Sequence, residues 1–75
     1  MLDTLEKLIK LIRERKNNPV DGSYTNKLIS NKPFSKEKVL EEINELIEAV
    51  ENDSNKIHEA ADVLYHLFVY IEANN

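Results

Sequence analysis

The 75-residue sequence contains no cysteine, so neither a disulfide nor a thiolate-bound zinc ion can stabilise its fold. Its single glycine and two prolines supply few turn residues, which disfavours a β-rich fold. No apolar run approaches the roughly 18 residues of a membrane span. The N-terminal segment MLDTLEKLIKLIRERK also lacks the continuous apolar core of a signal peptide. We therefore expect a cytoplasmic protein without a membrane partner.

The length and charge of the chain limit what it can be. A chain of 75 residues predicts one domain, over residues 1–75, that buries only about 60% of its unfolded surface. Such a thin core indicates that oligomerisation contributes to stability. The net charge of −4 disfavours a nucleic-acid partner, because phosphate backbones require a basic face. An acidic chain that acts on phosphates would have to recruit cations.

Apolar residues at helical spacing predict an all-α fold, a helical hairpin with an N-terminal helix packed against it. The expected long helices cover residues 3–16, 35–51 and 56–72, with a short helix at about 24–30. Ser35 is the expected N-cap of the second long helix. The polar turn at 52–55 suits an antiparallel hairpin. The stripes expected to face the core are Leu5, Leu8, Ile9 and Ile12, then Val39, Leu40, Ile43, Leu46, Ile47 and Val50, then Ile57, Ala60, Ala61, Leu64, Leu67, Phe68 and Ile71.

Acidic residues are numerous on the second long helix. If its stripe faces the core, Glu42 lies about 100° round the helix, at the edge of the stripe, and Glu45 lies further on the same flank. Glu41 and Glu48 then lie on the back, and Glu48 is expected to be ordinary surface. On this helix alone, a solvated outer face is the favoured interpretation of these acids.

The third long helix gives these acids a partner. Glu59, Asp62 and His66 share one face, at spacings of three and four residues. The segment 63–71 that follows is nearly apolar all round, and a helix of this kind is buried on more than one side. The two acids therefore lie at the head of a packed helix.

Clustered carboxylates near a packed surface repel one another, and a hard cation removes this conflict. An antiparallel hairpin can bring a Glu-x-x-Glu pair and a Glu-x-x-Asp pair together. Oxygen ligands of this kind suit Mg²⁺, with Mn²⁺ as an alternative. The chemistry that uses such a cluster is phosphoryl or nucleotidyl transfer, in which a metal neutralises phosphate charge and positions water.

These motifs resemble those of a known family. The pattern EExxE at 41–45 followed by ExxD at 59–62 is similar to the signature of the all-α nucleotide pyrophosphohydrolases of MazG type. Within that superfamily, GSYTNKL, KVLEE and EAADVLYHL resemble segments of phosphoribosyl-ATP pyrophosphohydrolases of histidine biosynthesis. The likeness spans residues 5–70. Leu40 stands where the family usually has Gly, and family members commonly carry a further C-terminal helix.

The resemblance implies hydrolysis of phosphoribosyl-ATP to phosphoribosyl-AMP and pyrophosphate, with Mg²⁺ or Mn²⁺ as cofactor. It also implies a homodimer or higher homo-oligomer. Glu42, Glu45, Glu59 and Asp62 would bind the metal, and Glu41, Glu42 and Glu45 would be catalytic. Glu41 is the uncertain member of the signature, because its angle on the helix places it behind Glu45.

Other polar residues have alternative interpretations. Tyr24 either packs on the nucleotide or anchors the connector, and Lys27 and Lys38 either bind substrate phosphates or are solvated. His66 is expected to be a hydrogen-bond partner of the site or an interface residue, because magnesium disfavours imidazole. His58 is expected to be exposed and receives no role.

Two other functions compete with the leading hypothesis. The first is a pyrophosphohydrolase of the same superfamily that acts on another nucleoside triphosphate, either a free standard one or a non-standard one. The second is a helical assembly module without catalytic activity, which would keep the apolar stripes and need no acid cluster. The sequence retains every acid of the signature, which argues against the second alternative.

Overall fold

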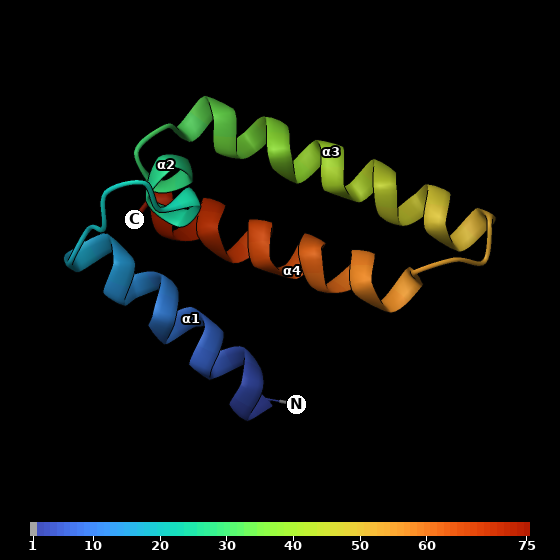
Figure 1. The fold of residues 1–75 in the computed structure, drawn as a ribbon, viewed down its shortest axis with the longest axis horizontal. Helices are drawn as coiled ribbons and strands as arrows, with labels where there is room; N and C mark the ends of the chain where they lie inside the picture. Colours follow the sequence, from blue (N-terminus) through green and yellow to red (C-terminus); the bar gives the residue numbers. More distant parts are fainter. Residues whose placement is uncertain (1) are drawn as a thin grey trace.

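The computed structural model of the protein describes residues 2–75, and all the regular secondary structure in that range is helical. Figure 1 shows α3 and α4 running antiparallel as a hairpin, with α2 at the end where α3 begins and α4 ends. Helix α1 contacts α4 and α2 but not α3. The predicted hairpin with an N-terminal helix is therefore confirmed. The helices are α1 (Leu2–Asn17), α2 (Tyr24–Ile29), α3 (Lys32–Glu51) and α4 (Lys56–Ala73).

Over these residues, no helix combines the length and the apolar character that crossing a membrane requires.

The core lies where α1, α2 and α4 meet, at one end of the hairpin. Ile12, Leu28 and Val69 are at most 1% exposed, and each comes from a different helix. Partly buried apolar side chains surround them, namely Leu8, Ile29, Phe34, Tyr65 and Phe68. Burial of these side chains fixes α1 and α2 against the C-terminal half of α4.

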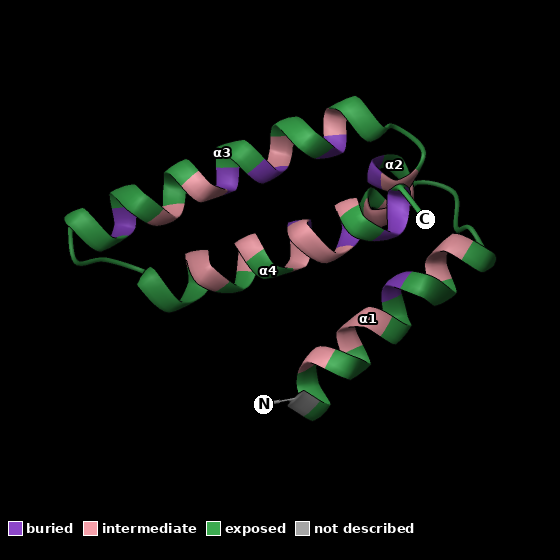
Figure 2. Ribbon diagram, turned by 180° about the vertical axis from the view of Figure 1, so that it is seen from behind, coloured by how far each residue is buried: buried purple, intermediate pink, exposed green. Residues whose placement is uncertain are grey.

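The orientation expected for the apolar stripe of α4 is wrong. Ile57, Leu64 and Ile71 are 84%, 40% and 54% exposed, whereas His66 and Val69 on the other face are buried. Figure 2 shows exposed residues along the outer side of the hairpin helices. The face with acids is turned inward because Val69 joins the core and His66 bonds to α2.

Helix α3 begins at Lys32, not near Ser35 as expected. The side chain of Asn31 is the N-cap and accepts a hydrogen bond from the backbone N–H of Phe34 at 3.1 Å. Pro33 lies in the first turn, where a missing N–H is tolerated. Ser35 is 1% exposed inside the helix, so its small side chain serves packing.

The two turns use residues that tolerate positive φ. Gly22 has a φ of +79° in the turn before α2, as its Asp-Gly sequence predicts. In the hairpin turn, Asp53 and Asn55 have φ values of +51° and +52°. Asn and Asp enter this region more readily than other residues with a Cβ. The predicted turn at 52–55 is confirmed.

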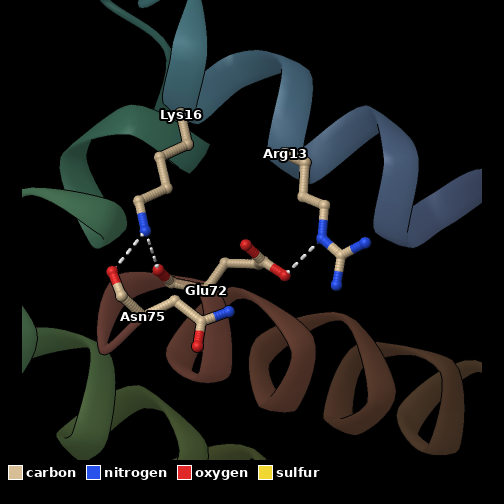
Figure 3. Close-up of polar contacts among 4 residues, drawn as sticks. All are labelled: Arg13, Lys16, Glu72 and Asn75. Atoms are coloured by element: carbon tan, nitrogen blue, oxygen red, sulfur yellow. Dashed lines mark hydrogen bonds and ion pairs between the residues drawn. The ribbon is translucent and has the colours of Figure 1, made fainter.

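A polar contact joins α1 to the C-terminal end of α4 (Figure 3). The Nε of Arg13 donates to Glu72 Oε1 at 2.8 Å, and Glu72 is only 5% exposed. The ammonium of Lys16 donates to the carbonyl oxygens of Glu72 at 2.7 Å and Asn75 at 2.8 Å. Cations at a helix C-terminus satisfy its last carbonyls and oppose the negative end of its dipole.

We predict that Arg13→Met lowers the free energy of unfolding by about 1 kcal/mol, because the buried Glu72 carboxylate loses its charged donor. Urea unfolding of the variant and the parent protein measures the change. Arg15→Met is the matched control, since the Arg15 guanidinium lies 3.9 Å from an exposed Glu14. Equal loss in both variants would contradict a specific role for the Arg13–Glu72 contact.

Candidate metal and nucleotide site

Carboxylates from both hairpin helices meet at the seam between α3 and α4. One oxygen atom each of Glu42, Glu45 and Glu59 can be chosen so that all lie within 4.8 Å of one another. A second group with the same spacing contains His58, Glu59 and Asp62, so Glu59 belongs to both. The two acid pairs recognised in the sequence therefore come together across the hairpin.

Two of these carboxylates have buried oxygen atoms without a partner. Glu42 is 8% exposed, and its Oε2 has no hydrogen-bond donor within reach among the described residues. The Oε2 of Glu59 is also inaccessible and unpaired over the same residues. Leaving such atoms desolvated and unsatisfied costs free energy. A cation held by oxygen ligands would satisfy both, so these residues fit Mg²⁺ or Mn²⁺.

Crowding at this seam changes the ionisation of Glu42. Its pKa is raised from 4.5 to about 7, chiefly by burial and then by hydrogen bonding with Glu45 and the charges of Glu45 and Asp62, while the charge of Lys38 acts in the opposite direction. The carboxyl group of Glu42 is therefore partly protonated near neutral pH in the protein without a cation. Binding of a cation would favour its ionised form.

Glu41 lies apart from the clustered acids. Its side chain is 55% exposed and pairs with the Lys38 ammonium at 3.2 Å. Glu48 is exposed as expected, but it does not lie on the back of the helix away from the site, because it lines a cavity of about 210 Å³ together with Glu45 and Glu59. Its spacing of three residues after Glu45 could have signalled this position.

His58 is the second residue near the site that the sequence interpretation left without a role. It is exposed as expected, but its Nε2 lies 3.5 Å from Asp62 Oδ2. The i,i+4 spacing of His58 and Asp62 on one helix was the available signal. Its place beside Glu59 and Asp62 adds a nitrogen donor at the exposed edge of the acid cluster.

Two hydroxyl contacts hold α2 against α4. The Nδ1 of His66 lies 2.8 Å from the Asp62 carbonyl, which can only accept, so Nδ1 carries the proton. The Nε2 is then the acceptor of the Tyr24 hydroxyl at 3.1 Å. Next to this contact, the hydroxyls of Thr25 and Tyr65 are hydrogen-bonded. Both ring nitrogens of His66 are thus engaged, which agrees with a hydrogen-bonding role for it.

Tyr24 stands between the acids and a larger cavity. Burial raises the pKa of its hydroxyl, with Tyr65, Glu42 and Glu41 acting in the same direction and the charge of Lys38 acting against them. On its other side, Tyr24 and Lys27 line a cavity of about 530 Å³ between α2 and the end of α1. Cavities of this size commonly hold small molecules. Tyr24 and Lys27 therefore line the same cavity. Lys38 does not line it and instead pairs with Glu41 on α3.

Comparison with known proteins gives a consistent result. A phosphoribosyl-ATP pyrophosphatase of Clostridium acetobutylicum is 43% identical over 97% of this chain and 69% of its own length. The phosphoribosyl-ATP pyrophosphatase of Bacillus cytotoxicus is 40% identical over the whole chain and 73% of its length. A histidine biosynthesis bifunctional protein of Caldanaerobacter subterraneus is 42% identical, but this chain covers only 38% of it. No solved structure matches the chain.

The acid pattern and the EAADVLYHL segment fall inside residues 5–75, the part of the chain that matches the phosphoribosyl-ATP pyrophosphohydrolase family as a whole. Since this match agrees with relatives that are similar over nearly the whole of this chain, the chain belongs to the phosphoribosyl-ATP pyrophosphohydrolase family.

Proposed function

We propose that this protein hydrolyses phosphoribosyl-ATP to phosphoribosyl-AMP and pyrophosphate, a step of histidine biosynthesis. The names of the relatives give the reaction, and the family match covers residues 5–75. The observation that supports it best within the chain is the pair of buried, unpaired carboxylate oxygens on Glu42 and Glu59. The domain 1–75 and a cytoplasmic location stay predictions from the sequence.

The proposed metal-binding residues are Glu42, Glu45, Glu59 and Asp62. Their oxygen atoms suit Mg²⁺ or Mn²⁺, and either ion supplies, when bound, neutralisation of phosphate charge and orientation of water. The distances support Glu42, Glu45 and Glu59 as one group, with Asp62 adjacent through Glu59. Glu41 is proposed to act indirectly, because its exposed carboxylate pairs with the Lys38 ammonium and belongs to neither group of clustered acids.

In the proposed reaction, a water oxygen attacks the α-phosphorus, and the bond from this phosphorus to the bridging oxygen breaks. Pyrophosphate leaves with the electron pair of that bond. A carboxylate of the cluster accepts the proton of the water, and Glu42 and Glu45 are the candidates because both lie in the group of clustered acids. A general base must lie within hydrogen-bond reach of the proton that it takes.

We also propose that a second copy of the chain covers the outer sides of the hairpin. Two apolar rows with a seven-residue spacing lie there, Leu40 and Ile47 on α3 and Ile57, Leu64 and Ile71 on α4. A spacing of seven is close to two helical turns, so each row runs along its helix. Apolar rows of this extent are normally covered, and pairing of two hairpins into a helical bundle would cover them.

Asp62→Asn and Glu45→Gln are each expected to lower pyrophosphate release by roughly a hundredfold or more, because the amide keeps the shape but loses the charge that holds the cation. Pyrophosphate released from phosphoribosyl-ATP in millimolar magnesium is the measurement. Glu51→Gln, an exposed acid on the same helix as Glu45, is the control. If both site variants fold and keep near-normal turnover, the assignment of the site is wrong.

Thermal melts at about pH 5 and pH 7.5 test the cation site. The free energy of unfolding depends on pH when a titratable group, here the Glu42 carboxyl, has a different pKa in the folded and unfolded states. The pKa of Glu42 is about 7 in the folded protein against an ordinary 4.5. The folded state therefore binds this proton more tightly, and in chelator its stability should fall as the pH rises between these values. Glu42→Gln should remove this component.

Millimolar magnesium should raise the midpoint more at the higher pH, where the carboxylates that bind it are ionised. Glu51→Gln again serves as the control, because its exposed carboxylate should leave both effects unchanged. Equal midpoints with and without magnesium at the higher pH would count heavily against a cation site.

Sedimentation at micromolar concentration should reveal no folded monomer of the natural sequence. Leu64→Glu places a charge in the apolar row of α4 and should dissociate the assembly or unfold the chain. Leu11→Glu is the matched control, because Leu11 is 52% exposed on α1 and away from the hairpin rows. A well-folded monomer of the natural sequence would contradict the proposed assembly.

A further inference from the structure

The larger cavity differs in charge and in lining from the acid site. It measures about 530 Å³ and lies between the end of α1, the turn that follows it and α2. Two lysines, Lys16 and Lys27, line it, with Asp21 as the only acid among its lining residues. The acid site, by contrast, gathers Glu42, Glu45 and further carboxylates. The lysines of the cavity can attract an anionic group directly, whereas the carboxylates of the acid site can hold one only through a bound cation.

Its wall is held in place before any ligand binds. The side chain of Asn26 accepts a hydrogen bond from Val20 N–H at 2.8 Å and donates to the Arg15 carbonyl at 2.7 Å. The Ser23 N–H donates to the Val20 carbonyl at 3.1 Å, which closes the turn. A preformed wall reduces the ordering cost that a ligand must overcome on binding.

Both lysines that line the cavity keep ammonium donors that are not used within the described residues. Lys16 uses two of its three ammonium donors on the carbonyls of Glu72 and Asn75, which fixes its position. Lys27 lies 5.2 Å from the centre of the Phe34 ring and forms no ion pair with the described acids. Both ammonium groups can therefore approach an anion as point charges.

The proposed substrate has two anionic ends, a triphosphate and the phosphate of its ribosyl group, separated by a purine. A cation can hold the triphosphate at the carboxylates, but those same carboxylates would repel a second phosphate. Tyr24 lies between the two regions, since its hydroxyl bonds to His66 beside Asp62 and the residue also lines the cavity. Its 43% exposed side chain leaves an aromatic surface for the purine.

We infer that the cavity between α1 and α2 binds the phosphoribosyl half of the substrate, with Lys27 and Lys16 contacting its phosphate and Tyr24 contacting the purine. This inference rests on the proposed function and assigns the two ends of the substrate to separate places. It makes Lys27 a residue that distinguishes phosphoribosyl-ATP from nucleotides without the second phosphate.

The test compares Lys27→Gln with Lys27→Arg, which retains the charge, and with Lys10→Gln, an exposed lysine of α1 that does not line the cavity. Lys27→Gln should raise KM for phosphoribosyl-ATP by about tenfold, the size expected for loss of one charge-assisted contact, with little change in kcat. Ribose 5-phosphate should inhibit the natural sequence competitively and Lys27→Gln more weakly. Lys27→Arg and Lys10→Gln should behave as the natural sequence does.

The outcomes separate the two proposals. If the natural sequence releases no pyrophosphate from phosphoribosyl-ATP, the proposed function fails. If it does so but Lys27→Gln keeps its KM and ribose 5-phosphate does not compete, only the cavity assignment is overturned. The shift of the thermal midpoint by magnesium should be equal in all variants, because Lys27 lies outside the acid cluster.

Discussion

Carboxylates that face each other across the α3–α4 seam dominate this small fold. The two helices pack along their length, yet the seam between them buries Glu42 rather than another apolar side chain. The Oε2 atoms of Glu42 and Glu59 are left without donors, and the pKa of Glu42 rises to about 7 as a result of burial and neighbouring acids. A hairpin designed for stability alone would place leucine here, because an unsatisfied buried carboxylate opposes folding. The arrangement is understandable if a cation and substrate phosphates complete the seam.

This inward orientation of the acids determines where the apolar residues go. An α-helix cannot turn its acidic face toward a neighbour without turning the opposite face away. In α4, Glu59, Asp62 and His66 face inward, so Leu64 and Ile71 face outward. The exposed apolar rows and the buried acids are thus two consequences of one rotation of the helix. A covering second copy would stabilise the same rotation that assembles the acids, which links assembly to the proposed chemistry.

Much of this could be predicted from the sequence, because helical periodicity fixes which residues share a face. The spacing of Glu42 and Glu45, and of Glu59 and Asp62, was enough to predict clustering, and the helix ranges followed from apolar periodicity and turn residues. Which face of each helix points inward could not be predicted. Because α4 is apolar on nearly every side, apolar character alone does not decide whether Leu64 or Val69 enters the core. The choice depends on contacts distant in sequence, such as Tyr24 with His66.

The small helix α2 connects these features, although it has only six residues. A helix this short has little stability of its own, so its position depends on Leu28 in the core and on two hydroxyl contacts with α4. Those contacts place Tyr24 over the face of α4 that carries the acids, and they place the turn before α2 against the end of α1. A short helix held by its neighbours can therefore act as a divider between an acidic, cation-dependent region and a lysine-lined cavity. This division lets a net acidic chain bind a substrate with two anionic ends, since each end meets its own source of positive charge.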